Sequence, residues 1–237
     1  MATRPALRFY FSLRSPYSWL AYHDLRTRYR ALGDRLEWIP FWEPDELSLR
    51  LLAEAGGQFV YTPMSRAKHL YVLQDARRLA RERGLLFTWP VDRSPWWEVP
   101  HLAYLVARRQ DRGAEFIAAA LRARWQDGRD ICDQETISDI AVSLGLDPAA
   151  VRGAVDDPSV RAEGVAALLS IYRDGVFGVP FFVRGYDKYW GVDRLPAFAD
   201  AVRAADEPIE EPPLVEALTV PESELVATDG GHAGGCG

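Results

Sequence analysis

LRFYFSLRSPYSWLA, residues 7–21, joins a short apolar run to the beginning of a helix. The run LRFYFSL, residues 7–13, has the length and the aromatic content of a strand. Pro16 favours a helix start at that point, because proline lacks the N–H that would be left unpaired in the first turn. The segment therefore predicts a strand that passes directly into a helix at Ser15 and Pro16.

The first turn of that helix is a place where negative charge is stabilised. Unpaired backbone N–H groups and the helix dipole both favour an anion there. A cysteine in this position ionises readily, with a pKa lowered to about 3.5–7.5, whereas a serine hydroxyl is too weakly acidic. Ser15 and Ser18 cannot form a disulfide, so Ser15 is interpreted as a hydrogen-bond donor to the thiolate of another molecule. The alternative is that Ser15 only caps the helix.

A second segment, GVPFFV at residues 178–183, follows a predicted helix that ends near Asp174 and Gly175. Pro180 cannot donate a hydrogen bond inside a sheet, so it must lie at the start of a strand, at an edge or in a cis turn. In thioredoxin-like folds a cis-proline faces the active site, and the residue before it, here Val179, pairs its main chain with an extended thiol peptide. An ordinary proline in an edge strand is the alternative.

Four stretches together resemble the family of 2-hydroxychromene-2-carboxylate isomerases and kappa-class glutathione transferases, a branch of the DsbA-like thioredoxin superfamily. They are FYFSLRSPYSWLA (9–21), KHLYVLQDARRLARERGL (68–85), RARWQDGRDICDQE (122–135) and GVFGVPFFV followed by WGVDRL (175–195). The resemblance covers most of residues 7–205. It implies an α/β, thioredoxin-like fold with a large all-helical insertion, glutathione binding and, often, a homodimer.

The resemblance also assigns roles to positions of this chain. Ser15 would donate a hydrogen bond to the sulfur of the cofactor, and Asp193 with Arg194 would hold the glutamyl end of the tripeptide. The residues expected to bind the cofactor are Lys68, Val179, Pro180, Asp193 and Arg194. The residues expected to take part in catalysis are Ser15, Tyr17 and Ser18. Residues 57–59 and Val192 depart from the family's pattern, so the cofactor is expected to be glutathione or another low-molecular-weight thiol.

The chain contains eight tryptophans, which are candidates for lining a substrate pocket. An aromatic cleft between the thioredoxin unit and the insertion would suit a flat conjugated substrate. The residues expected there are Trp42, Trp96 and Trp97. The alternative is that they belong to the core, which is common for tryptophan. Relatives tend to carry an asparagine in the region of Trp96, so the resemblance implies a substrate other than the family's naphthalene-pathway compound.

The chain has 237 residues, of which 48% are hydrophobic, and this is enough for a full core in one domain with an insertion. A net charge of −6 gives no support for nucleic-acid binding. No apolar run is long enough to cross a bilayer, and residues 1–8 lack the apolar core of a signal peptide. Cys132 and Cys236 lack the spacing of a disulfide framework, so a cytoplasmic protein is expected. The four histidines have no metal-ligand spacing, so no metal is expected.

The predicted thioredoxin-like domain is discontinuous and comprises residues 1–44 and 176–205, with residues 45–175 as the helical insertion. Strands are expected at 7–13, 36–41, 181–184 and 188–190. Helices are expected at 16–32, 66–83, 99–110, 114–126, 134–144, 148–155, 159–173 and 193–204. Gly33 is expected to stop the first helix, and Asp133, Asp147 and Asp157 to cap later ones. Residues 206–237 are acidic and Gly-rich, which predicts a flexible tail with Cys236 near its end.

The function hypothesis is a thiol-dependent cis-trans isomerase. Its substrate would be a conjugated unsaturated carbonyl compound, aromatic or polyene-like, free or attached to a carrier, and the reaction would proceed by reversible thiolate addition. The pathway would be aromatic catabolism or natural-product biosynthesis. The alternatives are a glutathione transferase of kappa type and a non-catalytic DsbA-like binding protein. Cys132 precedes a predicted helix and is either a nucleophile or a small buried residue.

Overall fold

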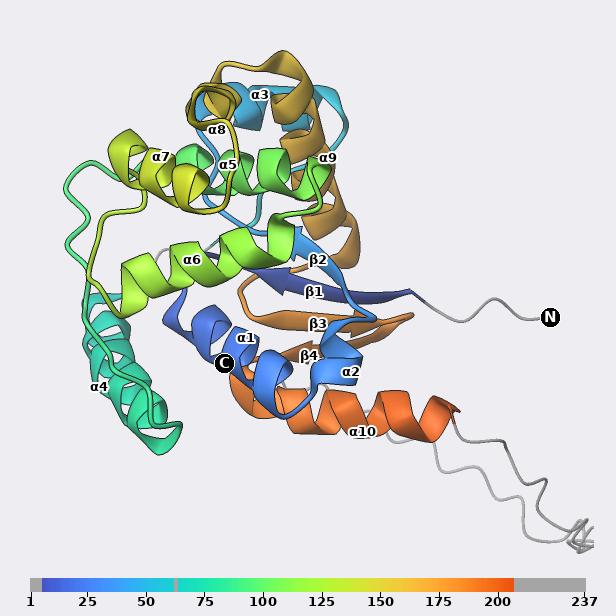
Figure 1. Ribbon diagram of the computed structural model, residues 1–237. Coiled ribbons are helices and arrows are strands. Elements are labelled where there is room, and N and C mark those ends of the chain that lie inside the picture. Colours follow the sequence, from blue (N-terminus) through green and yellow to red (C-terminus); the bar gives the residue numbers. More distant parts are fainter. Residues whose placement is uncertain (1–5, 62–63, 207–237) are drawn as a thin grey trace, which may run out of the picture.

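The computed structural model describes residues 6–61 and 64–206. In this part of the chain four strands form one sheet in the order β2-β1-β3-β4 (Figure 1). They are β1 (Leu7–Phe11), β2 (Glu37–Pro40), β3 (Phe181–Arg184) and β4 (Asp187–Trp190). β2 runs parallel to β1, whereas β3 is antiparallel to both β1 and β4. The predicted tail, with Cys236, lies outside the described residues except for Asp206, which ends the last helix.

The single helix expected over residues 16–32 is two helices, α1 (Pro16–Thr27) and α2 (Arg30–Gly33). α1 ends because the N–H groups of Arg28 and Tyr29 both bond to the C=O of Asp24, at 2.8 and 3.0 Å. Gly33 therefore belongs to α2 and does not stop α1. A Cβ on Gly33 would lie 3.1 Å from the C=O of Leu25, so glycine lets the two segments approach closely.

Between β2 and β3 the described residues form helices and loops, without a strand. The helices are α3 (Glu46–Glu54), α4 (Arg66–Glu82), α5 (Glu98–Arg109), α6 (Gly113–Trp125), α7 (Gln134–Ser143), α8 (Pro148–Arg152), the 3₁₀ turn η1 (Gly153–Val155) and α9 (Pro158–Asp174). The expected caps are present, since Asp133, Asp147 and Asp157 accept N–H groups of α7, α8 and α9. The boundaries of the predicted insertion domain stay a prediction.

The helix that follows the sheet along the chain packs against it. The helix expected over 193–204 begins as a 3₁₀ turn, η2 (Val192–Arg194), and continues as α10 (Leu195–Asp206). Phe198 of α10 stacks on Phe182 of β3 with 5.2 Å between ring centroids, and Phe182 stacks on Phe9 of β1 at 4.9 Å. These aromatic contacts join α10 to the two central strands.

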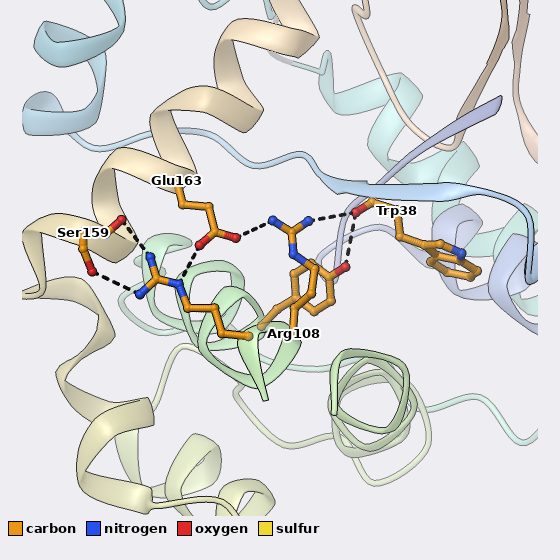
Figure 2. A network of polar contacts seen from close by, with 6 residues as sticks. Trp38, Arg108, Ser159 and Glu163 are labelled. Atoms are coloured by element: carbon orange, nitrogen blue, oxygen red, sulfur yellow. Dashed lines mark hydrogen bonds and ion pairs between the residues drawn. The ribbon is translucent and has the colours of Figure 1, made fainter. Parts of the chain in front are cut away.

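β2 is an edge strand, and a polar network covers its outer side (Figure 2). The C=O of Trp38 accepts hydrogen bonds from the hydroxyl of Tyr104, at 3.2 Å, and from Arg108, at 3.4 Å. Figure 2 shows the carboxylate of Glu163 between two guanidinium groups, those of Arg108 and Arg109. An uncovered edge exposes unpaired main-chain groups. This network provides partners for one of them, the C=O of Trp38, and ties β2 to α5 and α9.

No helix in residues 6–61 and 64–206 has the length and the apolar composition needed to cross a membrane. The same ranges contain no group of three His, Cys, Asp or Glu side chains placed to hold a metal ion.

Candidate functional site

The site is built where β1 ends and β3 begins. In the register of the sheet Tyr10 lies opposite Phe181, so the chain after β1 and the chain before β3 meet at one end of the sheet. The first of these segments leads into α1 through Ser15, and the second contains Val179 and Pro180. The fold therefore brings together the two segments from which the sequence predicted the site, although they lie more than 160 residues apart.

Ser15 is the N-cap of α1, and Pro16 is the first residue of the helix. Its hydroxyl oxygen accepts a hydrogen bond from the N–H of Ser18 at 3.2 Å, and its own N–H donates to the C=O of Ser12 at 3.1 Å. The hydroxyl is partly exposed, and a hydroxyl that accepts a bond still has its proton to donate. Capping the helix and donating to an incoming anion are thus compatible roles for Ser15.

The side chains of the other two predicted catalytic residues, Ser18 and Tyr17, form hydrogen bonds within the protein. Ser18 is 1% exposed, and its hydroxyl oxygen accepts the N–H of Ser12 at 3.1 Å. Tyr17 donates its hydroxyl to the carboxylate of Asp75 on α4 at 2.8 Å. Burial and this carboxylate raise the pKa of Tyr17, so its proton stays in that hydrogen bond at neutral pH. The predicted catalytic roles of Ser18 and Tyr17 stay predictions that these contacts do not support.

The peptide bond between Val179 and Pro180 is cis, and Pro180 directly precedes β3. A cis turn and the start of a strand were two of the three placements expected for this proline. The C=O of Pro180 accepts the N–H of Gly191 at 2.9 Å. Val179 is half-buried, and its N–H and C=O have no hydrogen-bond partner among the residues that the structure describes. Its main chain is therefore available to an extended peptide.

Trp190 of β4, for which the sequence predicted no role in the site, connects the cis-proline segment with α4. The residue is 47% exposed, and a Cβ added to Gly178 would lie 3.1 Å from the indole nitrogen. The ammonium group of Lys68 lies 5.9 Å from the centre of the Trp190 ring, at cation–π distance. Trp190 thus adjoins both Lys68 and the residue before Val179. In the sequence, the only indication of this role was that Trp190 begins the stretch WGVDRL, which resembles the family.

Asp193 and Arg194, the remaining predicted cofactor residues, belong to η2. Their side chains are 71% and 63% exposed and lie 3.9 Å apart. η2 follows β4, which ends at Trp190, and packs against α1, the helix that Ser15 caps. Their charges are open to solvent and are not committed to the interior.

Two of the three tryptophans expected to line a substrate pocket are core residues. Trp42 is 2% exposed and stacks on His101, with 5.5 Å between the rings. Trp97 is 5% exposed, and the guanidinium groups of Arg14 and Arg124 lie 5.2 and 5.0 Å from its centre. Burial therefore favours the interpretation as core residues for these two, and their place in a substrate pocket stays a prediction. Trp96 is partly exposed and donates its indole N–H to Asp45.

A charged cleft of about 550 Å³ adjoins Ser15 in place of the expected aromatic one. Its walls are formed by Arg14, Glu43, Tyr61, Met64, Arg66 and His69. Arg14 pairs with Glu43 at 2.5 Å, whereas Arg66 forms no ion pair with any described residue. The cleft thus carries an excess of positive charge beside Ser15. No local sequence pattern indicates this cleft, because its residues come from three separate segments.

Cys132 was the alternative nucleophile. It is 9% exposed, and burial raises the pKa of its thiol to about 12. A thiol that stays protonated at neutral pH is a poor nucleophile. Cys132 therefore behaves as a small buried residue, which was the other interpretation.

His101 of α5 is a further residue of the site that the sequence did not reveal. It is completely buried, and its ring contacts the segment between β1 and α1. The spacing of the histidines bears only on metal binding, and a histidine within the apolar helix VPHLAYLV carries no local signal of such a contact.

Comparison with known proteins agrees with this geometry. A family model described as a DSBA-like thioredoxin domain matches residues 6–203. A 2-hydroxychromene-2-carboxylate isomerase from Sphingobium xenophagum is 32% identical over 192 residues, which are 79% of this chain and 92% of that relative.

Solved structures show the same fold at lower sequence identity. The structure of a 2-hydroxychromene-2-carboxylate isomerase superposes with a TM-score of 0.66 at 20% identity and covers 84% of this chain and 95% of that one. The cytosolic disulfide reductase DsbM from Pseudomonas aeruginosa with GSH gives a TM-score of 0.57 at 19% identity and covers 84% and 98%. The chain belongs to the DsbA-like thioredoxin family and, within it, to the 2-hydroxychromene-2-carboxylate isomerases, which confirms the predicted fold and the predicted class of enzyme, an isomerase.

Proposed function

We propose that this protein is a thiol-dependent cis-trans isomerase that acts on a conjugated, unsaturated carbonyl compound. The observation that carries the proposal is the position of Ser15, a hydroxyl at the N-terminus of α1, at the end of the sheet where the cis-proline segment also lies. A dithiol exchange is impossible there, while the field that stabilises a sulfur anion is retained. The isomerase relative supports the class of reaction.

The residues present fit a small thiol peptide such as glutathione. The unpaired N–H and C=O of Val179 match the two main-chain groups of an extended cysteinyl residue. Lys68 offers a cation for a carboxylate, and the exposed Asp193 and Arg194 offer both charges needed by a glutamyl end. The DsbM structure with GSH shows that a protein of this fold accommodates that tripeptide. A cytoplasmic location would keep such a thiol reduced.

When bound, the thiol would supply a nucleophile that adds reversibly to the conjugated double bond and leaves after rotation about the resulting single bond. Ser15 would donate its hydroxyl proton in a hydrogen bond to the sulfur position and so favour the anionic form. The first N–H groups of α1 act in the same direction. Both groups are fixed before the substrate arrives, and this preorganisation is what lowers the barrier.

The charged cleft supports a carboxylate-bearing substrate. Arg66 has no ion-pair partner among the described residues, and Arg14 adjoins Ser15 directly in the chain. An arginine suits a carboxylate because its fork of N–H donors binds both oxygens. A carboxylate held there would orient the conjugated system beside the sulfur position, and the same cations would stabilise an enolate oxygen. The isomerase relative is also named for a carboxylate substrate.

The test follows the ultraviolet spectrum of 2-hydroxychromene-2-carboxylate and of other conjugated cis carboxylates, each with and without glutathione. An isomerase converts the spectrum to that of the trans form and leaves the glutathione concentration unchanged. A kappa-type transferase consumes glutathione and releases a thioether, and a binding protein does neither. Thiol uptake is measured separately by calorimetry. Absence of uptake, together with undiminished turnover when no thiol is present, would contradict the proposal.

A further inference from the structure

We infer that His101 is a positioning residue, which holds the turn between β1 and α1 in the conformation that places Ser15. The inference rests on the proposed function, because it assigns His101 a part in the same site. His101 lies on α5 and contacts neither the cis-proline segment nor the charged cleft, so it would act only through this turn.

The hydrogen bonds of the imidazole define its protonation. Nδ1 lies 2.7 Å from the C=O of Trp97, one helical turn earlier, and a carbonyl can only accept. Nδ1 therefore carries the proton, and Nε2 is an acceptor. Nε2 accepts the N–H of Leu13 at 3.1 Å and lies 3.3 Å from the hydroxyl oxygen of Ser12, which can donate to it.

Hydrogen bonds of Ser12 connect His101 with Ser15. The hydroxyl oxygen of Ser12 accepts the N–H of Arg14 at 3.2 Å, and the C=O of Ser12 accepts the N–H of Ser15 at 3.1 Å. The N–H of Ser12 is bonded to the hydroxyl oxygen of Ser18 at 3.1 Å. The turn is thus closed on itself and on α1, and the imidazole of His101 joins it to the helical part of the molecule.

The surroundings keep the imidazole neutral. Burial, opposed by the C=O of Trp97 and assisted by the charges of Arg124 and Arg14, lowers the pKa of His101 to about 3. The ring also stacks on Trp42, which fixes its plane. A protonated ring would direct a second N–H at the N–H of Leu13, so neutrality preserves the contact. An apolar side chain in its place would leave Leu13 N–H and Ser12 O–H buried without a partner.

The consequence concerns the hydroxyl of Ser15 and the first N–H groups of α1, which must converge on one sulfur position. A displacement of about 1 Å in a catalytic group can lower turnover by about 100-fold. His101 is therefore expected to affect the pKa of the bound thiol and the turnover number more than the Michaelis constant for the acceptor, because Arg14 is the only wall residue of the cleft that belongs to this turn.

The experiment compares four single variants of the full chain. H101F keeps a flat ring against Trp42 but removes all three polar contacts of the imidazole, those with Trp97, Leu13 and Ser12. H101Q retains a carbonyl that can accept Leu13 N–H, whereas the shorter side chain of H101N cannot reach it. Y104F is the matched control, because it removes a side-chain hydrogen bond from the same helix, the one to the C=O of Trp38, which takes no part in the His101 contacts. The readouts are amide hydrogen exchange at Leu13 and Ser15, the pKa of bound glutathione from thiolate absorbance, and the steady-state constants.

We expect H101F and H101N to speed exchange at Leu13, to raise the pKa of bound glutathione and to lower the turnover number by about 10- to 100-fold. H101Q should recover most of each effect, and Y104F should show none of them. If H101F does not fold, H101Q against H101N decides the question. The inference is wrong if exchange at Leu13 and the thiol pKa are unchanged, or if activity merely follows stability in all four variants. If the wild-type chain takes up no glutathione, the proposed function fails, and the exchange measurement still decides the role of His101.

Discussion

The two sides of the candidate site are held in different ways. The turn that carries Ser15 is fixed by main-chain hydrogen bonds and by the buried ring of His101. The helix that carries Lys68, α4, buries only Val72, Ala76 and Ala80. Figure 1 shows α4 beside α1 and away from α5, α8 and α9. The difference indicates that the groups acting on the sulfur are rigid, whereas the groups that surround the ligands can adjust.

Two side-chain contacts hold α4 against α1. Tyr17 donates to Asp75 at 2.8 Å, and Arg83 pairs with Asp24 at 2.8 Å. Both partners of the second pair are largely buried, with side chains 11% and 6% exposed. A helix attached by a few polar contacts opens at a lower free energy than one packed in a core. Changes on the Ser15 side should therefore alter turnover, and changes on the α4 side should alter affinity.

The largest expected effect is that of S15A, which tests the rigid side. The change removes the proton donor to the sulfur, and turnover should fall by about 100- to 1000-fold, as when one preorganised donor is lost. Stability should fall by only about 1 kcal/mol, the usual value of an N-cap. D133A is the matched control, because Asp133 caps α7 through the N–H of Glu135. It should lose similar stability and keep its activity. Losses of activity in proportion to stability would make Ser15 a cap alone.

The next effect is that of R83M, which loosens α4. Removing one partner of a buried ion pair typically costs about 3–5 kcal/mol. We expect about 2–3 kcal/mol here, because α4 can separate from α1 and let water reach Asp24. The Michaelis constant for glutathione should rise, since Lys68 is then poorly placed, while turnover at saturating thiol is retained. Chemical denaturation and steady-state kinetics measure the two effects. A fall in turnover without a change in affinity would mean that α4 is part of the rigid side.

A third prediction concerns acid stability and again tests the rigid side. The pKa of His101 in the folded chain, about 3, is below its ordinary value of 6.5, so between these values the unfolded chain binds a proton that the folded chain does not. The contribution of His101 is complete above pH 6.5 and declines as pH falls, by at most about 1.4 kcal/mol per pH unit. Denaturation curves at several pH values should therefore show a shallower acid loss for H101Q than for the wild type. If the stability of both proteins declined equally with falling pH, the pKa of His101 would not be lowered in the folded chain.

Local sequence signals predicted much of the fold and part of the site. The strand and helix around Ser15, the placement of Pro180 before β3 and the three aspartate caps each depend on neighbouring residues, and each is present. Residues whose role depends on tertiary packing were missed or misplaced. His101 is surrounded by apolar residues in the chain, so nothing local shows that its ring faces the Ser15 turn. Trp42 and Trp97 were expected in a cleft because composition does not distinguish a lining ring from a buried one.

The smallest expected effect is that of K68M, at the adjustable side. The ammonium group of Lys68 is exposed and lies over the half-exposed ring of Trp190, so its interaction with a carboxylate is screened by water. We expect the affinity for glutathione to fall about three- to fivefold, which corresponds to at most about 1 kcal/mol. Because Lys68 does not touch the Ser15 turn, the turnover number and the pKa of the bound thiol should stay unchanged. K68R, which keeps the charge, should bind almost as well as the wild type, and the difference between the two variants should shrink as salt is added. Calorimetry at low and high salt measures this, and a large fall in turnover for K68M would place Lys68 among the rigid groups with Ser15.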